Sequence, residues 1–408
     1  MRTRLPVVVV TVGVALIGCG RLGPEATPED VLFLRSGGGV TLVRDLPEGV
    51  AVNLRGAVPS TDWSAVARAV PNSPQTRIEV LDPLTGAELW SRNVPVDDLE
   101  VKVAARNGSI VALGSRGGSA GYPRGRSATT LVILREDTPQ PRTIELEGNY
   151  EPEAFSADGE SLFVVEYLPP ERPTRYQVRR LDLLTEEVVG VYTPDAHLQE
   201  AMQGTARIQA ASRDGRRLYT LYTLVTRGTT RAFVHVLSLD ELWAHCIDLP
   251  SNFATARESA VALSLTPEGN HLYVVDASTG TIADIDTEAL AVSRTTEAEL
   301  GGGGGPANAV VAPGGDLYVA RGARFLALDT DTMATGQTWD MQARITGLQA
   351  ANDGGRLYVG LRDRIEIIDT ATGEGLGSLD PENLEDIEQL GQSTRLLEEE
   401  RTAIECAC

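Results

Sequence analysis

The sequence predicts an all-β protein made of one repeated unit. Apolar residues with a helical period are almost absent before residue 380. The repeated unit instead joins a turn dipeptide, Asp-Gly or close to it, to a Leu-aromatic pair and an apolar run of strand character. It recurs as SADGESLFVVEY (156–167), SRDGRRLYTLY (212–222), TPEGNHLYVVD (266–276), APGGDLYVAR (312–321) and NDGGRLYVGL (352–361). Steps of 40 to 56 residues between these copies fit a four-stranded blade, so we expect a single β-propeller from 31 to 392.

Weaker copies continue the repeat upstream and raise the count to eight. They are ARNGSIVALG (105–114), STDWSAVARAV (60–70) and VLFLRSGGG (31–39), the last of which lacks its leading strand. An eight-bladed ring then needs its missing innermost strand from the far end of the chain, and LEDIEQLGQ (384–392) lies where that strand is expected. Two alternatives stay open: Asp380-Pro381-Glu382 is also a good helix start, and an irregular first repeat would leave a seven-bladed ring.

A further strand in most repeats ends in aspartate. These strands are RIEVLDPLTG (77–86), YQVRRLDLLT (176–185), TIADIDTEAL (281–290), RFLALDTDTM (324–333) and RIEIIDTATG (364–373), with aspartates at Asp82, Asp182, Asp286, Asp329 and Asp369. A carboxylate in this place commonly accepts hydrogen bonds from the N–H groups of the following turn, which predicts a structural role. With its Leu-Tyr-Val and Ile-Asp-Thr motifs, the repeat resembles the YVTN and WD40-like propeller families. That resemblance implies the fold and no particular activity.

The N-terminal segment has the layout of a bacterial export signal. Arg2 and Arg4 precede a fourteen-residue apolar run that ends at Gly18, which is too short to span a bilayer comfortably. Leu16-Ile17-Gly18-Cys19 resembles the lipobox of bacterial lipoproteins, which implies cleavage before Cys19 and lipidation of its sulfur. We therefore expect a signal peptide over 1–18, a lipidated tether over 19–30 and a charged tail over 393–408. A plain signal peptide or a buried strand, with an ordinary cysteine, is the alternative.

The composition is that of a globular, acidic protein. Apolar residues make up 42% of the chain and charged residues 23%, which argues against disorder. The net charge is −21, and loss of Arg2 and Arg4 with the signal peptide takes it to −23. A body this acidic repels nucleic acid and anionic lipid headgroups, so we expect neither as its main partner. We expect a monomer that reaches the membrane of the cell envelope only through its lipid anchor.

Three cysteines remain outside the lipobox. They are Cys246, Cys406 and Cys408. An exported protein is permitted disulfides, so a bond from Cys246 to either tail cysteine is one interpretation and free thiols are the other. The Cys-x-Cys pair in the tail has no further metal ligands near it in the sequence, so no metal site is predicted there.

Three consecutive repeats carry long connections that we expect on one face of the ring. They are SRGGSAGYPRGRSATT (115–130), EYLPPERPTRY (166–176) and TLVTRGTTRA (223–232). Long connections in a compact repeat are often functional. The candidate binding residues on them are Tyr122, Arg124, Arg126, Tyr167, Arg172, Arg175, Tyr176, Arg227 and Arg231. Arginine pairs with carboxylates in a bidentate way and tyrosine anchors interfaces, so this face suits an acidic protein or a carboxylate-bearing ligand. The alternative is a set of solvated hairpins with scattered arginines.

Enzyme signals are weak, and no cofactor, metal site or catalytic residue is predicted. His197, His235, His245 and His271 occupy dissimilar places in the repeat, so they define no shared metal site or base. The stretch VLDPLTGAELWSRNV (80–94) resembles the repeat of quinoprotein dehydrogenases and of outer-membrane assembly lipoproteins, with Trp90 docking between blades. It occurs once, so it does not establish a quinone cofactor.

The function that the sequence favours is a membrane-anchored binding or scaffolding module, displayed outside the cytoplasmic membrane. Two other functions stay open. One is a hydrolase or lactonase that holds a divalent metal in the central channel, by resemblance to other propellers. The other is an assembly factor for envelope proteins, which rests only on the lipid anchor and the blades.

Overall fold

The computed structural model describes residues 29–36, 39–44, 52–115, 124–193, 202–226, 229–253, 260–300, 304–380 and 384–393. Glu29–Ser393 is one compact unit of the chain. The signal peptide, most of the tether and all but the first residue of the charged tail expected from the sequence lie outside the described residues. Within the described ranges, no helix has the length and apolarity to cross a bilayer.

The described residues form eight antiparallel sheets of four strands each. We call these sheets blades and number them in chain order. Blade 1 contains β32 (Leu384–Ser393), β1 (Glu29–Ser36), β2 (Gly39–Arg44) and β3 (Val52–Arg55). Blade 2 contains β4 (Val58–Pro59), β5 (Val66–Asn72), β6 (Gln75–Leu81) and β7 (Glu88–Val94). Blade 3 contains β8 (Leu99–Ala104), β9 (Ile110–Ser115), β10 (Ala128–Arg135) and β11 (Arg142–Glu147), with the short 3-10 helix η1 (Arg106–Gly108) after β8.

The remaining blades repeat the same order from inner to outer strand. Blade 4 contains β12 (Asn149–Phe155), β13 (Ser161–Leu168), β14 (Arg175–Asp182) and β15 (Val188–Gly190). Blade 5 contains β16 (Thr205–Ala211), β17 (Arg217–Thr226), β18 (Thr229–Ser238) and β19 (Ala244–Asp248). Blade 6 contains β20 (Val261–Leu265), β21 (His271–Asp276), β22 (Thr281–Asp286) and β23 (Ala291–Glu297). Blade 7 contains β24 (Ala307–Val311), β25 (Asp316–Arg321), β26 (Arg324–Asp329) and β27 (Thr335–Asp340), and blade 8 contains β28 (Ile345–Ala350), β29 (Arg356–Leu361), β30 (Ile365–Asp369) and β31 (Gly375–Leu379).

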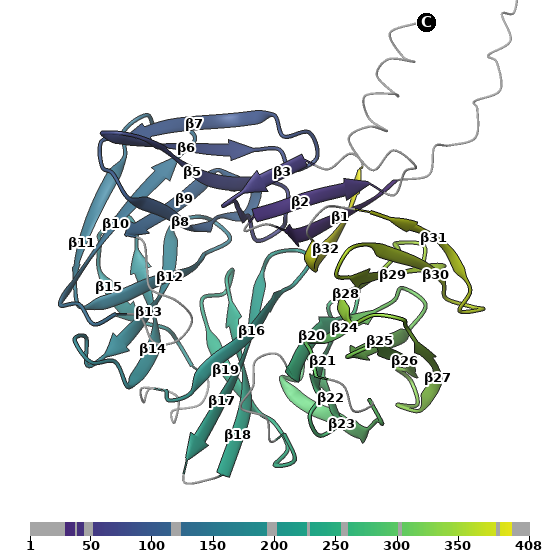
Figure 1. Ribbon diagram of the computed structural model, residues 1–408. Coiled ribbons are helices and arrows are strands. Elements are labelled where there is room, and N and C mark those ends of the chain that lie inside the picture. The colour runs from purple at the N-terminus through teal and green to yellow at the C-terminus, as the bar shows by residue number, and fades with distance from the viewer. Residues whose placement is uncertain are drawn as a thin grey trace, which may run out of the picture. The chain divides into compact units, whose positions relative to one another are not determined.

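The blades follow one another around a ring, as Figure 1 shows. First strands of neighbouring blades contact each other, for example β20 with β24 and β24 with β28, so these strands surround the ring axis. Apolar clusters fill the spaces between neighbouring blades, because one sheet cannot cover both of its own faces. The tyrosines of the repeated Leu-Tyr pair are buried in these clusters or beside them; they are Tyr219, Tyr273, Tyr318 and Tyr358. The prediction of an all-β propeller is confirmed.

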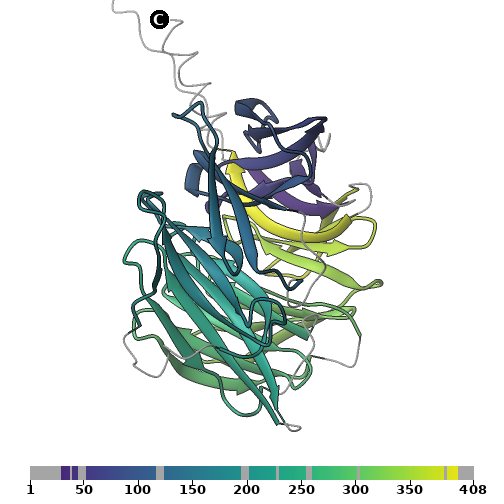
Figure 2. The ribbon, with the colours of Figure 1, turned by 90° about the vertical axis from the view of Figure 1, so that its left-hand side faces the viewer.

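Strand β32 completes blade 1 and so closes the ring. It pairs antiparallel with β1 from Glu29 opposite Ser393 to Ser36 opposite Leu384. Figure 2 shows the yellow β32 beside the purple β1. Ile387 is buried in a cluster with Leu32 and Leu34. The segment is therefore a strand and not the helix that Asp380-Pro381-Glu382 permitted, because β1 offers an unpaired edge that only a strand satisfies.

A buried carboxylate links β1 to blade 8 at the same junction. Asp30 accepts hydrogen bonds from Asn352 Nδ2 at 2.9 Å, Arg356 Nη2 at 3.0 Å and Tyr358 Oη at 2.9 Å. Asp30 is more than 300 positions in the sequence from each of the three donors. Hydrogen bonds to an ionised group are among the stronger ones, so this contact holds the two ends of the ring together. We call Asp30, Asn352, Arg356 and Tyr358 the closure cluster.

The aspartates that end the third strands bind the turns that follow them. Asp286 Oδ1 accepts from the N–H groups of Glu288 at 2.9 Å and Ala289 at 2.8 Å, and Asp369 does the same with Ala371 and Thr372. The same pattern occurs at Asp82, Asp182 and Asp329. These backbone hydrogen bonds lower the pKa of Asp286 and Asp369. The predicted turn role of these residues is confirmed.

Trp90 docks between blades 2 and 3, as its resemblance to other propeller repeats implied. Its side chain is buried and its Nε1 donates to the carbonyl oxygen of Gly108 at 3.1 Å. Gly108 is the last residue of η1 and has a φ of 70°. A Cβ at that position would meet Val80 Cγ1 at 2.9 Å and would overlap the side chain of Ala65, so only glycine fits there.

Candidate functional site

The long connections expected on one face belong to blades 3, 4 and 5. They join the second and third strands, namely β9 to β10, β13 to β14 and β17 to β18. Neighbouring strands within a blade run in opposite directions. The connection from the second to the third strand therefore emerges on the same face of the ring as the linker from one blade to the next. Tyr122 and Arg227 lie outside the described residues, so their part in this face stays a prediction.

The connections of blades 3 and 4 interlock through their main chains. Asn149 is fully buried and its Nδ2 donates to the carbonyl oxygens of Arg124 and Pro170, both at 3.0 Å. The N–H of Arg126 donates to the carbonyl oxygen of Pro170 at 3.0 Å. Between them, a Cβ on Gly125 would overlap the carbonyl oxygen of Glu171, so the two connections approach as closely as glycine allows. The main chain of this part of the face is therefore held in place by contacts between the two connections.

Two predicted recognition residues have structural roles instead. Tyr176 is 2% exposed, and its ring stacks on that of Tyr222 at 5.0 Å between centroids. Arg126 Nη2 binds Glu151 Oε1 at 2.7 Å and the carbonyl oxygen of Tyr150. The prediction that both side chains are available to a partner is wrong. Tyr176 is packed between blades 4 and 5, and Arg126 is paired with the carboxylate of Glu151.

The other described members of the set remain at the surface. Arg124, Arg172 and Arg175 are exposed, and none of the described acidic side chains forms an ion pair with them. Arg231 is 69% exposed and lies 3.5 Å from an equally exposed Asp248, a contact that screening by water weakens. Tyr167 is half-buried beside Tyr176, at 6.4 Å between ring centroids. The exposed face therefore consists of three arginines without an ion-pair partner among the described residues, with Arg231 and Tyr167 beside them.

Beneath this face, side chains fill the space between blades 4 and 5 in layers. Strand β17 presents Tyr222, Thr220 and Leu218 to blade 4 at alternate positions. The Tyr222 layer is aromatic, with Phe233 stacked on it at 5.3 Å, and the Leu218 layer is aliphatic. The middle layer is polar, since Gln209, Thr220, His235 and Cys246 are successive cross-strand partners. We call these four residues the polar row of blade 5.

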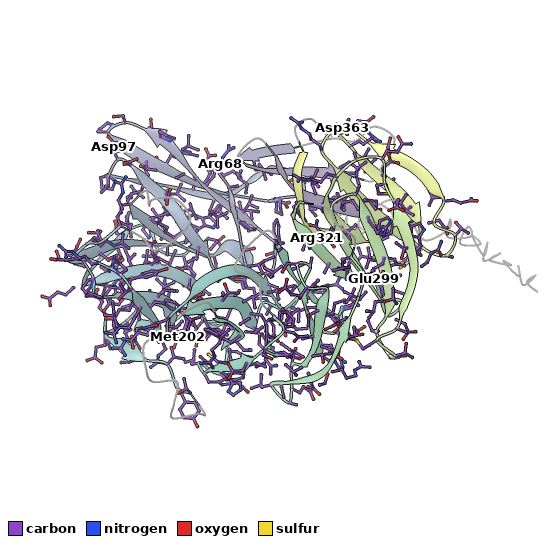
Figure 3. All side chains as sticks on the ribbon, turned by 60° about the horizontal axis from the view of Figure 1, so that its bottom comes forward. Arg68, Asp97, Met202, Glu299, Arg321 and Asp363 are labelled. Atoms are coloured by element: carbon purple, nitrogen blue, oxygen red, sulfur yellow. The ribbon has the colours of Figure 1, made fainter. Side chains whose placement is uncertain are left out.

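The outer end of the polar row opens into a groove of about 530 Å³ between blades 4 and 5. Six of the residues that line it are Gln177, Arg179, Tyr192, Met202, His235 and Cys246. Figure 3 labels Met202 among the side chains of this region. Arg179 Nε lies 3.2 Å from Glu166 Oε2, and Gln177 Nε2 donates to the same oxygen at 2.5 Å. The groove therefore combines a neutralised arginine with a histidine, a thiol and a thioether.

Burial keeps both titratable members of the row uncharged at neutral pH. Burial, with a smaller effect from the nearby His245, lowers the pKa of His235 to about 4. Burial also raises the pKa of the Cys246 thiol to about 12, and Asp248 adds to the effect. Cys246 is a free thiol here, and Cys406 and Cys408 lie outside the described residues, so the disulfide stays a prediction.

Glu153 meets the inner end of the polar row. It is the bulged residue of β12, unpaired between Pro152 and Ala154, and its Oε1 accepts from Gln209 Nε2 at 3.0 Å. The side chain is partly exposed, but Oε2 is shielded from solvent and has no partner among the described residues. Burial raises the pKa of Glu153 to about 7. A bulge changes the direction in which a side chain points. No pattern in the sequence marked Glu153 as a residue of a site.

We expect Glu153→Gln to stabilise the protein at pH 8 more than at pH 5. The folded pKa exceeds the unfolded one, so folding favours the protonated acid and stability falls as pH rises from about 4.5 to 7. A neutral amide removes that loss, which predicts a gain of about 1–3 kcal/mol in the free energy of unfolding at pH 8. Urea unfolding at both pH values measures it. Glu147→Gln, at an exposed carboxylate of β11, is the control, and equal gains at both pH values would contradict the assignment.

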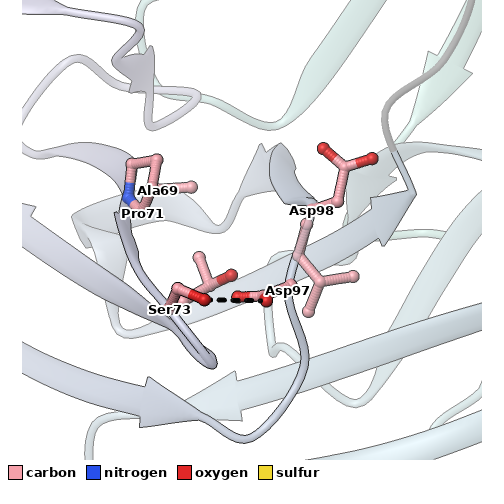
Figure 4. Close-up of a pocket in the computed structure, with 7 residues that line it drawn as sticks. Ala69, Pro71, Ser73, Asp97 and Asp98 are labelled. Carbon is pink, nitrogen blue, oxygen red and sulfur yellow. Dashed lines mark hydrogen bonds between the residues drawn. The ribbon is translucent and has the colours of Figure 1, made fainter.

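A second, smaller cavity of about 310 Å³ lies at the turn between β5 and β6 (Figure 4). Asp97 and Asp98 line it, and Ser73 Oγ donates to Asp97 Oδ2 at 3.3 Å. Thr76 Oγ1 donates to the carbonyl oxygen of Val96 at 2.8 Å. Three of its polar side chains, Ser73, Thr76 and Asp97, are thus engaged with one another or with the main chain. Nothing in it distinguishes a binding site from a hydrated turn.

Comparison with known proteins establishes the fold and leaves the activity open. A scan against models of protein families and a search of curated proteins found no match. Among solved structures, the chain is similar to apo AztD from Citrobacter koseri, with 12% identity, coverage of 90% of this chain and 99% of AztD, and a TM-score of 0.52. It is also similar to the dihydro-heme d1 dehydrogenase NirN in complex with DHE, with 13% identity, coverage of 92% and 77%, and a TM-score of 0.54. Both are β-propellers, and likeness at these identities concerns the fold alone.

Proposed function

We propose that this chain is an exported lipoprotein, anchored through Cys19, whose propeller is a binding or scaffolding module for an acidic partner. The observation that carries the proposal is the exposed group Arg124, Arg172 and Arg175 on one face of a strongly acidic molecule. Free guanidinium groups recognise carboxylates through paired N–H donors. A local cationic surface on an acidic body also orients an acidic partner toward that face.

The interlocked connections support recognition at this face. Asn149, Gly125 and Glu171 fix the main chain that bears Arg124 and Arg172. A surface that is ordered before binding loses less conformational entropy when a partner docks. Solvated hairpins with scattered arginines, the alternative interpretation of the sequence, need no such main-chain contacts between blades. Mass spectrometry of the mature N-terminus tests the anchor separately, through an acyl mass on Cys19.

Reversal of the three exposed arginines is expected to abolish partner binding. In Arg124→Glu, Arg172→Glu, Arg175→Glu, three attractive contacts become repulsive, which predicts a loss of more than about 100-fold in affinity. Quantitative mass spectrometry of proteins captured from detergent-solubilised envelope by the wild type and the variant measures the loss.

The control reverses the same number of charges on the opposite face. Arg106, Arg213 and Arg216 lie in connections between first and second strands, so their reversal to glutamate changes the net charge equally. A partner that the control retains and the loop variant loses supports the proposal. A partner captured equally by both variants and the wild type places recognition elsewhere.

A further inference from the structure

At the two middle positions of the polar row, Thr220 and His235, blade 5 has polar residues where blades 6 and 7 have apolar ones. Thr220 follows the Leu-Tyr pair of its repeat, where blades 6 and 7 have Val274 and Val319. The cross-strand partner of Thr220 is His235, whereas Val274 and Val319 face Ala283 and Leu326. Burial of a polar group costs free energy unless a partner compensates it. Folding alone therefore does not account for a buried imidazole at this position.

The ring of His235 faces the groove. His235 is 3% exposed and lines the groove, and no described residue hydrogen-bonds to its ring. Tyr222 packs against it edge-on, with centroids 6.2 Å apart and an interplanar angle of 88°.

Two sulfur donors share the groove with this nitrogen. Cys246 is the cross-strand partner of His235, so both side chains lie on one face of the sheet with Cβ atoms about 5 Å apart. Metal–sulfur and metal–nitrogen bonds of roughly 2.0–2.3 Å span such a separation. Met202 lines the same groove from the blade 4 side, where its main chain pairs with that of Tyr176 through hydrogen bonds of 2.7 and 3.0 Å.

We propose that His235, Cys246 and Met202 form a binding site for a soft monovalent metal ion of the Cu(I) class. Thiolate and thioether sulfur select such ions, and imidazole completes the set. Zn²⁺ takes four ligands from histidine, cysteine and carboxylate side chains. Among the described residues, no three side chains of these types lie close enough together to hold a metal ion. On binding, the metal replaces the proton of the Cys246 thiol, which passes to solvent.

The surrounding charge favours a cation in this groove. The chain carries a net charge of −21, and Asp248 lies close to Cys246. The one cation that lines the groove among the described residues, Arg179, is paired with Glu166. The site lies at the outer end of the polar row, and it requires neither the arginine face nor the lipid anchor, so the two proposals stand or fall separately.

The test is anaerobic titration of the full chain with Cu(I) against a competing chelator, repeated with Ag⁺ as a redox-inert probe. Cys19, Cys406 and Cys408 are replaced by serine in every sample, so that Cys246 is the remaining thiol. We expect one equivalent to bind, and X-ray absorption to record one nitrogen and two sulfur neighbours. Loss of a residue that only hydrogen-bonds to a metal ligand costs about 10–100-fold in metal affinity. Loss of a ligand itself costs more, so His235→Gln and Cys246→Ser are each expected to weaken binding by more than about 100-fold.

His245→Gln is the matched control, since His245 neighbours Cys246 in sequence but lies on the opposite face of β19. It is expected to bind as the parent does, and Met202→Leu is expected to bind more weakly than the parent. Circular dichroism of each variant checks the fold, and Cys246→Ser keeps the test valid if His235→Gln unfolds. No binding by the parent, or equal binding by the parent and Cys246→Ser, would overturn the site.

Discussion

A chain that ends after Asp380, and so lacks β32, is expected to lose its cooperative unfolding transition and to associate in solution. β32 supplies the pairing of β1 along its whole length and the burial of Ile387 against Leu32 and Leu34. Without it, β1 presents a bare strand edge, and edges of this kind template pairing between molecules. The loss is expected to exceed about 5 kcal/mol, a large fraction of the stability of a typical domain. Urea unfolding followed by size-exclusion chromatography measures both effects.

A chain that ends at Ser393 is the control, because it retains β32. We expect its unfolding midpoint and elution volume to match those of the full chain. A truncated chain without β32 that unfolds at the same urea concentration as the control would mean that the ring does not depend on its last strand.

Asp30→Ala is expected to destabilise the protein by about 3–5 kcal/mol, the cost of removing one partner from a buried charged network. The substitution deprives Asn352, Arg356 and Tyr358 of their shared acceptor and leaves the Arg356 guanidinium without its buried carboxylate. The closure cluster joins the first strand to the last complete blade, so its loss weakens the ring where no chain connection supports it. Thermal and urea unfolding measure the change.

Asp363→Ala gives the comparison, since Asp363 pairs with Arg364 at 3.2 Å but is 72% exposed. Exposed pairs contribute about 0–1 kcal/mol, so this substitution is expected to change little. Asp30→Asn is expected to fall between the two, because the amide keeps one acceptor oxygen. Equal effects at Asp30 and Asp363 would show that the closure cluster carries no special share of the stability.

Local patterns in the sequence were enough to predict the blades. The clearest repeats, those of blades 6, 7 and 8, carry a turn, a Leu-Tyr pair and a closing aspartate within about 30 residues, and these features act through contacts between near neighbours in the chain. The closing strand was predicted from a vacancy in the first repeat, although Asp380-Pro381-Glu382 left a helix open. The pairing edge of β1 decides in favour of a strand, and that is a contact across the whole chain.

The site was predicted less well because its features depend on contacts between repeats. Arg126 and Tyr176 have the residue types of a recognition surface, but Glu151 and Tyr222, from other strands, determine what they do. The polar row joins Gln209 to Cys246 across the four strands of blade 5, and it appears only when those strands are paired in register. A position-by-position comparison of repeats was the available signal, since Thr220 stands where valine recurs.

The central claim is that one ring is closed by pairing of β32 with β1, and disulfide trapping tests it most directly. In a chain with its native cysteines replaced by serine, Glu29→Cys with Ser393→Cys joins two residues that face each other in the register. A shift of one residue turns a side chain to the other face of the sheet, so Glu29→Cys with Gln392→Cys is the mismatched pair. We expect mild oxidation to form an intramolecular bond in the first pair and not in the second. Equal trapping of both pairs, or of neither, would contradict the closed ring.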